Sequence, residues 1–230
     1  MSSFFIKIFA LLFMIIDHVG FVLFPNELIY RIIGRLSFPL FAYQMAVGFS
    51  HTRSKEKHIL KLLLFAFICQ WPYNLMLQLY NSDFSLNIIF TFVLSLLIIY
   101  FIEKFKFIDK DNNKFDTKNF LICVLSSTLL MFTGISINVD YTWYGILLTI
   151  AFYFSINHKL LSSILFFLLI NLKYILDPSM MSLFAYISLF DILFIVLFNG
   201  KRGYKFSWIF YILYFIHFFM LLALKQYLQI

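Results

Sequence analysis

Long apolar runs limit the fold of this chain more than any other feature. Of its 230 residues, 63% are hydrophobic and only 13% are charged, and the mean hydropathy is +0.91. A water-soluble domain of this size does not carry so much apolar surface, whereas a helix that crosses a bilayer needs about 20 consecutive apolar residues. Because irregular backbone cannot face lipid, each long apolar run must be helical. The sequence therefore predicts an all-α polytopic membrane protein.

We predict about nine transmembrane helices in a single bundle, which forms one domain over residues 1–230. A transmembrane barrel would show alternating strands of about ten residues, and the sequence has none. The segment 142–156 is short for a span; if it forms a re-entrant hairpin with 160–176, the number falls to seven. The predicted segments are 4–24, 28–49, 59–80, 86–102, 120–138, 142–156, 160–176, 180–198 and 206–228.

Basic residues gather in alternate connections between these segments. Fourteen of the 18 lie on one side, whereas the opposite loops hold the acidic residues Glu27, Asp83, Asp140 and Asp177. The positive-inside rule then predicts a cytoplasmic N-terminus and an external C-terminus. The fourteen are Lys7, Arg53, Lys55, Lys57, Lys61, Lys104, Lys106, Lys110, Lys114, Lys118, Lys159, Lys201, Arg202 and Lys205.

Common catalytic and metal-binding patterns are missing from the sequence. Cys69 and Cys123 lie inside apolar segments and indicate neither a disulfide framework nor a metal site. There is no P-loop, dinucleotide fingerprint, HExxH motif or serine nucleophile elbow. The net charge of +7 comes from the short loops, so we expect no nucleic-acid partner. Histidines are the strongest base or nucleophile candidates within the membrane.

The first two segments form a predicted hairpin that carries an acid, an imidazole and a guanidinium. Asp17 and His18 lie about as far from the end of the first segment as Arg35 lies from the start of the second, so the three share one depth. Ionisable groups in a bilayer are costly and usually functional, which makes these residues the leading site candidates. Asp17 and His18 point about 100° apart on a helix, so Asp17 should pair with Arg31 or Arg35 rather than with His18.

Pro39 should open the second segment near Arg35, because its ring clashes with the carbonyl four residues earlier. A kink beside a buried guanidinium would make room for a ligand. The alternative is purely structural: an Asp–Arg pair that holds the hairpin together, with His18 hydrogen-bonded to a backbone carbonyl.

Further polar residues have both structural and functional interpretations. Asn87 and Thr91 share a helix face, and Gln70-Trp71-Pro72 is predicted to interrupt the third segment; such residues join helices as often as they bind ligands. Asp140-Tyr141 stands at an outer boundary, either in an aromatic belt or at the mouth of a cavity. On the last segment, Tyr211, Tyr214 and His217 cover one face, and Asp191 in the eighth needs a partner.

Several short motifs together resemble the TraX family, from about Lys7 to Leu222. They are Met14-Ile-Ile-Asp17-His18, Gly34-Arg35-Leu-Ser-Phe38-Pro39-Leu-Phe41, Gly48-Phe-Ser-His51-Thr52-Arg53, Asp140-Tyr141-Thr-Trp143-Tyr-Gly145, Asn199-Gly200-Lys201-Arg202-Gly203 and Phe210-Tyr211-Ile-Leu-Tyr214-Phe-Ile-His217. This family includes the membrane protein that N-acetylates F-type pilin. The resemblance implies a multi-pass acetyltransferase of the bacterial inner membrane, which takes an acetyl group from cytoplasmic acetyl-CoA and uses a histidine of an early helix.

The resemblance places that histidine at His18, with Asp17 and Arg35 beside it in the catalytic hairpin. We expect acetyl-CoA as the donor, no metal, and an amine or hydroxyl acceptor on a pilin, another peptide or a small molecule. Predicted substrate contacts are Arg31, Asn87, Asp140, Tyr141, Tyr214 and His217. The donor phosphates are expected at His51, Thr52, Arg53, Lys201 and Arg202. The alternative is that the positive charges in these segments only set the orientation of the chain in the membrane.

Two other classes of function remain open. A proton-coupled transporter would use Asp17, His18, Asp191 and His217 as a relay, and a membrane scaffold would use none of them chemically. Thioesterase or transfer activity with acetyl-CoA separates the acetyltransferase from both.

The predicted orientation is tested by single cysteines at Lys55, Asp83, Lys110 and Arg202, labelled with an impermeant reagent from either side. We expect labelling from the cytoplasm at 55, 110 and 202 and from outside at 83. Strong external labelling at 55 or 110 would overturn the orientation.

Overall fold

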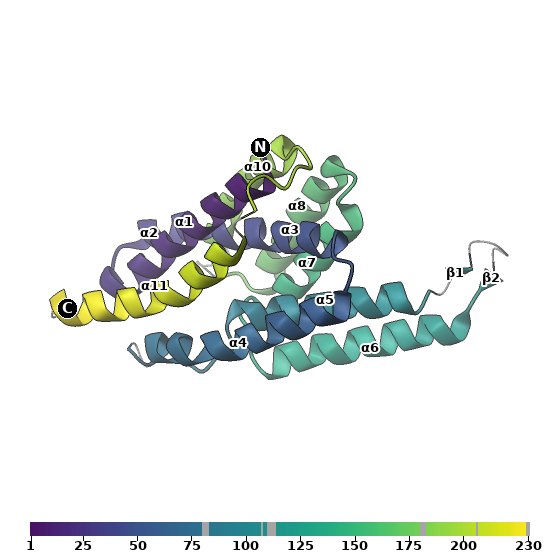
Figure 1. The fold of residues 1–230 in the computed structure, drawn as a ribbon, viewed down its shortest axis with the longest axis horizontal. Helices are drawn as coiled ribbons and strands as arrows, with labels where there is room; N and C mark the ends of the chain where they lie inside the picture. Colours follow the sequence, from purple (N-terminus) through teal and green to yellow (C-terminus); the bar gives the residue numbers. More distant parts are fainter. Residues whose placement is uncertain (80–82, 107, 110–113, 180–182, 206, 229–230) are drawn as a thin grey trace.

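Helices make up almost all of the regular structure in the computed structural model, which describes residues 1–79, 83–106, 108–109, 114–179, 183–205 and 207–228 (Figure 1). Its helices are α1 (Ser3–Leu23), α2 (Leu28–Gly34), α3 (Ser37–Ser50), α4 (Lys55–Gln78), α5 (Ile88–Lys104), α6 (Thr117–Ser136), α7 (Thr142–Ser155), α8 (Lys159–Leu176), η1 (Ala185–Phe190), α10 (Asp191–Leu197) and α11 (Ser207–Leu228). The strands in the described ranges, β1 (Ile108–Asp109) and β2 (Lys114–Phe115), form one short antiparallel pair beyond α5 and α6.

The predicted helical class is confirmed, and each predicted segment contains helix. Within the described residues, six helical stretches are long and apolar enough to cross a membrane, and α2 and α3 together (Leu28–Ser50) count as one of them. Three elements fall short of that length: α5 has 17 residues, α7 has 14, and the eighth segment is split between η1 and α10. The number nine therefore stays a prediction. The predicted boundaries at Tyr80, Met180 and Phe206, and Lys110 in the loop, lie outside the described residues.

The predicted opening of the second segment is confirmed. The backbone leaves α-helical geometry at Arg35 and Leu36, between α2 and α3, where both amides bond to carbonyls only three residues back. Pro39 follows within the first turn of α3, where its missing N–H costs little. The break therefore separates a short outer helix from the buried α3.

The predicted interruption at Gln70-Trp71-Pro72 is wrong. α4 runs through it without a break, from Lys55 to Gln78, and begins four residues before the predicted start at 59. Membrane helices tolerate an internal proline where neighbouring groups satisfy the freed backbone. Gln70 instead joins helices, because its side chain bonds to Asn74, to the Ser85 carbonyl and to Asn87.

The core lies along α3, which packs against α1, α7 and α10, while α5 packs against α4, α6 and α7 (Figure 1). The outer helices leave large apolar side chains uncovered. On α6, Leu125, Leu129 and Phe132 are each about two-thirds exposed (68%, 65% and 67%). An apolar face of this kind is stable against lipid acyl chains rather than water, in agreement with a membrane protein.

Glycines allow α1 and α2 to cross closely. A side chain at Gly20 would overlap Tyr30, and one at Gly34 would overlap the carboxyl of Asp17. The hairpin therefore depends on a missing side chain at the level of the candidate site.

Gly34→Ala should lower the stability of the protein by about 1–3 kcal/mol, because the added methyl group must displace Asp17. Gly48→Ala is the matched control, since no atom lies within 4 Å of a Cβ built there. Thermal unfolding of both variants in detergent gives the comparison, and equal melting temperatures would contradict this account.

Candidate functional site

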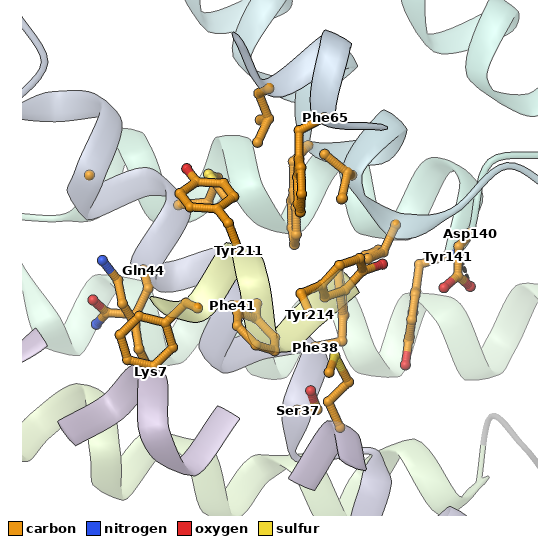
Figure 2. Close-up of a pocket in the computed structure, with 18 of the residues that line it drawn as sticks. Lys7, Ser37, Phe38, Phe41, Gln44, Phe65, Asp140, Tyr141, Tyr211 and Tyr214 are labelled. Atoms are coloured by element: carbon orange, nitrogen blue, oxygen red, sulfur yellow. Dashed lines mark hydrogen bonds between the residues drawn. The ribbon is translucent and has the colours of Figure 1, made fainter. Parts of the chain in front are cut away.

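A cavity of about 200 Å³ runs beside α3 through the interior of the bundle (Figure 2). Its lining residues recur every three or four positions, so each contributing helix presents one face to it. Along α2 and α3 these residues are Gly34, Ser37, Phe38, Phe41, Gln44, Met45 and Gly48. The stretch from Gly34 to Gly48 corresponds to about 20 Å of helix, so the cavity is long and narrow.

The cavity has polar groups at both ends and an apolar middle. Lys7, Gln44 and His58 lie at one end, and Asp17, His18 and Asp140 lie at the other. Figure 2 shows Lys7 and Gln44 on the opposite side of the cavity from Asp140 and Tyr141, with Phe41 and Tyr214 between them. The sequence predicted no site role for the residues at the Lys7 end: Lys7 was interpreted only as one of the basic residues that set membrane orientation, and Gln44 and His58 had no predicted role.

His18 is hydrogen-bonded to His217 of α11. His18 Nδ1 and His217 Nε2 are 2.7 Å apart. The ring planes differ by only 12°, with centroids 5.0 Å apart, so the two nitrogens point at each other in nearly one plane. The bond joins the first and last helices of the chain and leaves His18 Nε2 as its second nitrogen at the cavity.

Either histidine of this pair can donate the shared proton, depending on the tautomers. His217 is 5% exposed, and its Nδ1 has no hydrogen-bond partner among the described residues. When His18 Nδ1 is the donor and His217 Nε2 the acceptor, His18 Nε2 keeps a free lone pair, as a general base requires.

Asp17 does not contact His18 but holds two arginines. Its Oδ2 lies 2.7 Å from Arg31 Nη1, and its Oδ1 lies 3.3 Å from Arg35 Nη2. Arg35 also donates from Nε to the Arg31 carbonyl. The predicted Asp–Arg pair of the hairpin is thus confirmed, with both arginines sharing one carboxylate.

Arg35 lies behind the wall of the main cavity. It lines a second, smaller cavity of about 30 Å³ together with Tyr144 and Lys173. Phe38 and Tyr141 line both cavities, and their rings stack with centroids 3.9 Å apart. The guanidinium therefore acts on the main cavity through its field rather than by direct contact.

The connection between α6 and α7 carries Asp140 and Tyr141 to the cavity. Its backbone is in the left-handed region at Asn138, Tyr141 and Thr142, which is costly for a β-branched residue and typical of functional sites. The Asp140 backbone accepts from Thr91 Oγ1, and its carboxylate accepts from the Tyr141 amide. Burial raises the pKa of the Asp140 carboxyl to about 6, although the field of Arg35 opposes this shift.

A comparison of the chain with protein families finds a match over almost its whole length. The family model described as "TraX protein" matches residues 2–225. The chain belongs to the TraX family. The predicted resemblance is therefore confirmed over nearly the full length.

One curated relative is similar to part of this TraX-family chain. It is the "Probable fimbrial assembly protein FimC, serogroup H1" of Dichelobacter nodosus, 32% identical over 111 residues. The match covers 43% of this chain and 45% of the relative, so less than half of either protein is compared. No solved structure matches the chain.

Several predicted contacts of this TraX-family chain do not line the cavity. Asn87 caps α5 through the Ile89 amide and bonds to the Ala66 carbonyl and Gln70. His51 and Thr52 bond to carbonyls in the last turn of α3, and the Lys201 and Arg202 carbonyls accept from the amides of Ser3 and Phe4. Arg53 is exposed at the surface. Their predicted binding roles stay predictions.

Asp17→Asn should destabilise the protein by about 3–5 kcal/mol, because it leaves two partly buried guanidinium groups without a counter-ion. Glu103→Gln is the control. It removes the partner of Lys55 in a more exposed pair, which is worth about 0–1 kcal/mol. Chemical unfolding in detergent measures both losses, and a cost no larger for Asp17→Asn than for Glu103→Gln would contradict a central role for this network.

Proposed function

We propose that this protein transfers an acetyl group from acetyl-CoA to an amine, with the N-terminus of a pilin or another peptide as the preferred acceptor class. The observation that carries this proposal is the His18–His217 hydrogen bond at the wall of a long, narrow cavity. TraX membership and the relative named as a fimbrial assembly protein support the acceptor class.

The chemistry requires a base and an apolar channel. The amine nitrogen forms a bond to the acetyl carbonyl carbon while the carbon–sulfur bond breaks and coenzyme A leaves as the thiolate. His18 Nε2 takes the proton that the amine loses and returns it to the leaving sulfur, so the step is balanced. His217 acts as a positioning residue, because its hydrogen bond fixes the ring and the tautomer of His18. Transfer through an acetyl-histidine intermediate uses the same two residues.

Tyr214 is the best placed donor for the developing oxyanion. It lines the cavity, and its ring lies 5.5 Å from that of His217. Its hydroxyl makes no hydrogen bond within the described part of the chain, so it is available to the substrate. Arg35 contributes a positive field from behind the Phe38–Tyr141 wall and does not touch the reacting atoms.

The acceptor enters at the Asp140 end under this proposal, and the donor enters at the Lys7 end. With a pKa of about 6, Asp140 is mostly ionised at neutral pH and attracts an ammonium group to the mouth of the cavity. The charge distribution along the sequence supports an arrangement in which the Asp140 end faces outward and the Lys7 end faces the cytoplasm.

A proton-coupled transporter has less support. Of its four proposed relay residues, only His18 and His217 are joined by a hydrogen bond in the described structure. Asp17 is held by two arginines, and both carboxylate oxygens of the fully buried Asp191 lack a hydrogen-bond partner among the described residues. No hydrogen bond among the described residues connects the four side chains into a pathway.

His18→Ala should reduce the transfer rate by at least about 100-fold, the usual contribution of a general base, while the protein stays folded in membranes. The test uses sealed, oriented vesicles with acetyl-CoA on the cytoplasmic face and an impermeant peptide amine on the outer face. We expect acetylated peptide from the wild type, and a smaller loss for His217→Gln, which keeps a hydrogen-bonding group beside His18.

Two results would contradict the proposal. If His18→Ala retains most of the wild-type rate, His18 is not the base. If product forms only when donor and acceptor share the cytoplasmic face, transfer across the membrane is excluded.

A further inference from the structure

The cavity end opposite His18 holds polar groups that the proposed chemistry does not use. Gln44 is 3% exposed, and its Oε1 accepts a hydrogen bond from Ser3 Oγ. Its Nε2 is buried and has no hydrogen-bond partner among the described residues, and the same is true of His58 Nε2. Leaving a buried polar nitrogen without a hydrogen-bond partner destabilises a protein, so this end is incomplete without a ligand.

The charge at this end is positive and uncompensated. Lys7 lines the cavity, and in the described part of the chain its ammonium forms no salt bridge. The charged group that acts on it is Arg202, which has the same sign. Lys7 and Lys61 both act on His58. A partly buried ammonium among cations needs an anion, and no acidic side chain of the described structure supplies one.

The shape of the cavity selects a thin, linear ligand. Phe38, Phe41, Phe65 and Phe92 line its middle, so only an unbranched or narrow chain passes between the two polar ends. Lys7 and His18 lie on the same helix, eleven residues apart, which corresponds to about 16 Å. A ligand that spans this distance must carry an anion at one end, a reactive group at the other, and amide groups near the anion end.

We propose that Lys7, Gln44 and His58 form the recognition site for the phosphopantetheine arm of the acyl donor. Lys7 binds the phosphate, and Gln44 Nε2 donates to an amide carbonyl of the arm. His58 contacts the same polar stretch. The extended arm then brings its thioester to His18 and leaves the nucleotide outside the cavity, near Arg202. This inference rests on the proposed function, which supplies the thioester donor.

The site differs from the phosphate contacts expected from the sequence. Of those residues, His51, Thr52 and Arg53 lie beyond the end of α3, and two of these three bond to its last carbonyls. Gly48 lines the cavity one turn earlier. The recognition site is therefore inside the bundle, at the level where α1, α3 and α4 face one another.

The test measures binding of coenzyme A and of pantetheine, which lacks the phosphate, to the full-length protein in detergent by isothermal titration calorimetry. Lys7→Met keeps the apolar stem of the side chain and should weaken coenzyme A binding about tenfold or more, because a charge-assisted bond is lost. It should leave pantetheine binding unchanged. Lys57→Met, an exposed residue of α4 on the same side, is the control and should affect neither ligand.

Gln44→Leu should weaken the binding of coenzyme A and pantetheine alike, by about three- to tenfold, because both carry the amide. It is measured in a Ser3→Ala background so that no hydroxyl is left unpaired, with Ser3→Ala alone as the reference. This pattern, with phosphate-dependent loss at Lys7 and phosphate-independent loss at Gln44, is not produced by general unfolding.

The outcomes separate this inference from the proposed function. If wild-type protein binds no coenzyme A, or if Lys7→Met binds it as well as Lys57→Met does, the inference is overturned, and acetyl transfer in vesicles still reports on the proposed function. If binding follows the expected pattern but no acetyl group is transferred, the recognition site stands and the proposed function fails.

Discussion

The shared carboxylate of Asp17 is the interaction on which the rest of the site depends. It holds Arg31 and Arg35 at the level where α2 ends, and the absence of a side chain at Gly34 gives it the space to do so. Charges at this depth are stable only with partners, so the hairpin and its ion pairs form together. The next residue of α1, His18, points about 100° away from Asp17 and lines the same cavity, so the ion pairs that fix Asp17 also position His18.

Two helices and one connection, all distant in sequence, complete the site around this hairpin. α11 contributes His217 and Tyr214, α4 contributes His58 and Tyr73, and the connection before α7 contributes Asp140 and Tyr141. Each is held by packing rather than by a mobile loop, and the Phe38–Tyr141 stack closes the wall between the two cavities. A site built from helix faces in this way keeps its reactive groups in fixed positions.

The sequence predicted the parts of this structure that follow from depth and local geometry. The rule that buried charges need partners identified the Asp17–Arg pair, and the steric effect of Pro39 identified the break after α2. The contact between His18 and His217 spans 199 positions, and nothing in either helix specifies which helices become neighbours. At α4 the proline rule failed, because Pro72 is accommodated inside a continuous helix. Lys7 was missed because a lysine near the end of a span also fits the positive-inside rule.

The four phenylalanines in the middle of the cavity have a consequence for the energetics of the cell. A passage that joins the two faces of an inner membrane would let protons flow down their gradient if it were filled by a continuous file of water. Apolar constrictions prevent such files because water leaves narrow hydrophobic spaces. Phe38, Phe41, Phe65 and Phe92 interrupt the polar path between Lys7 and Asp140, so in the proposed arrangement the protein would admit an acyl chain while it insulates the membrane against proton leakage.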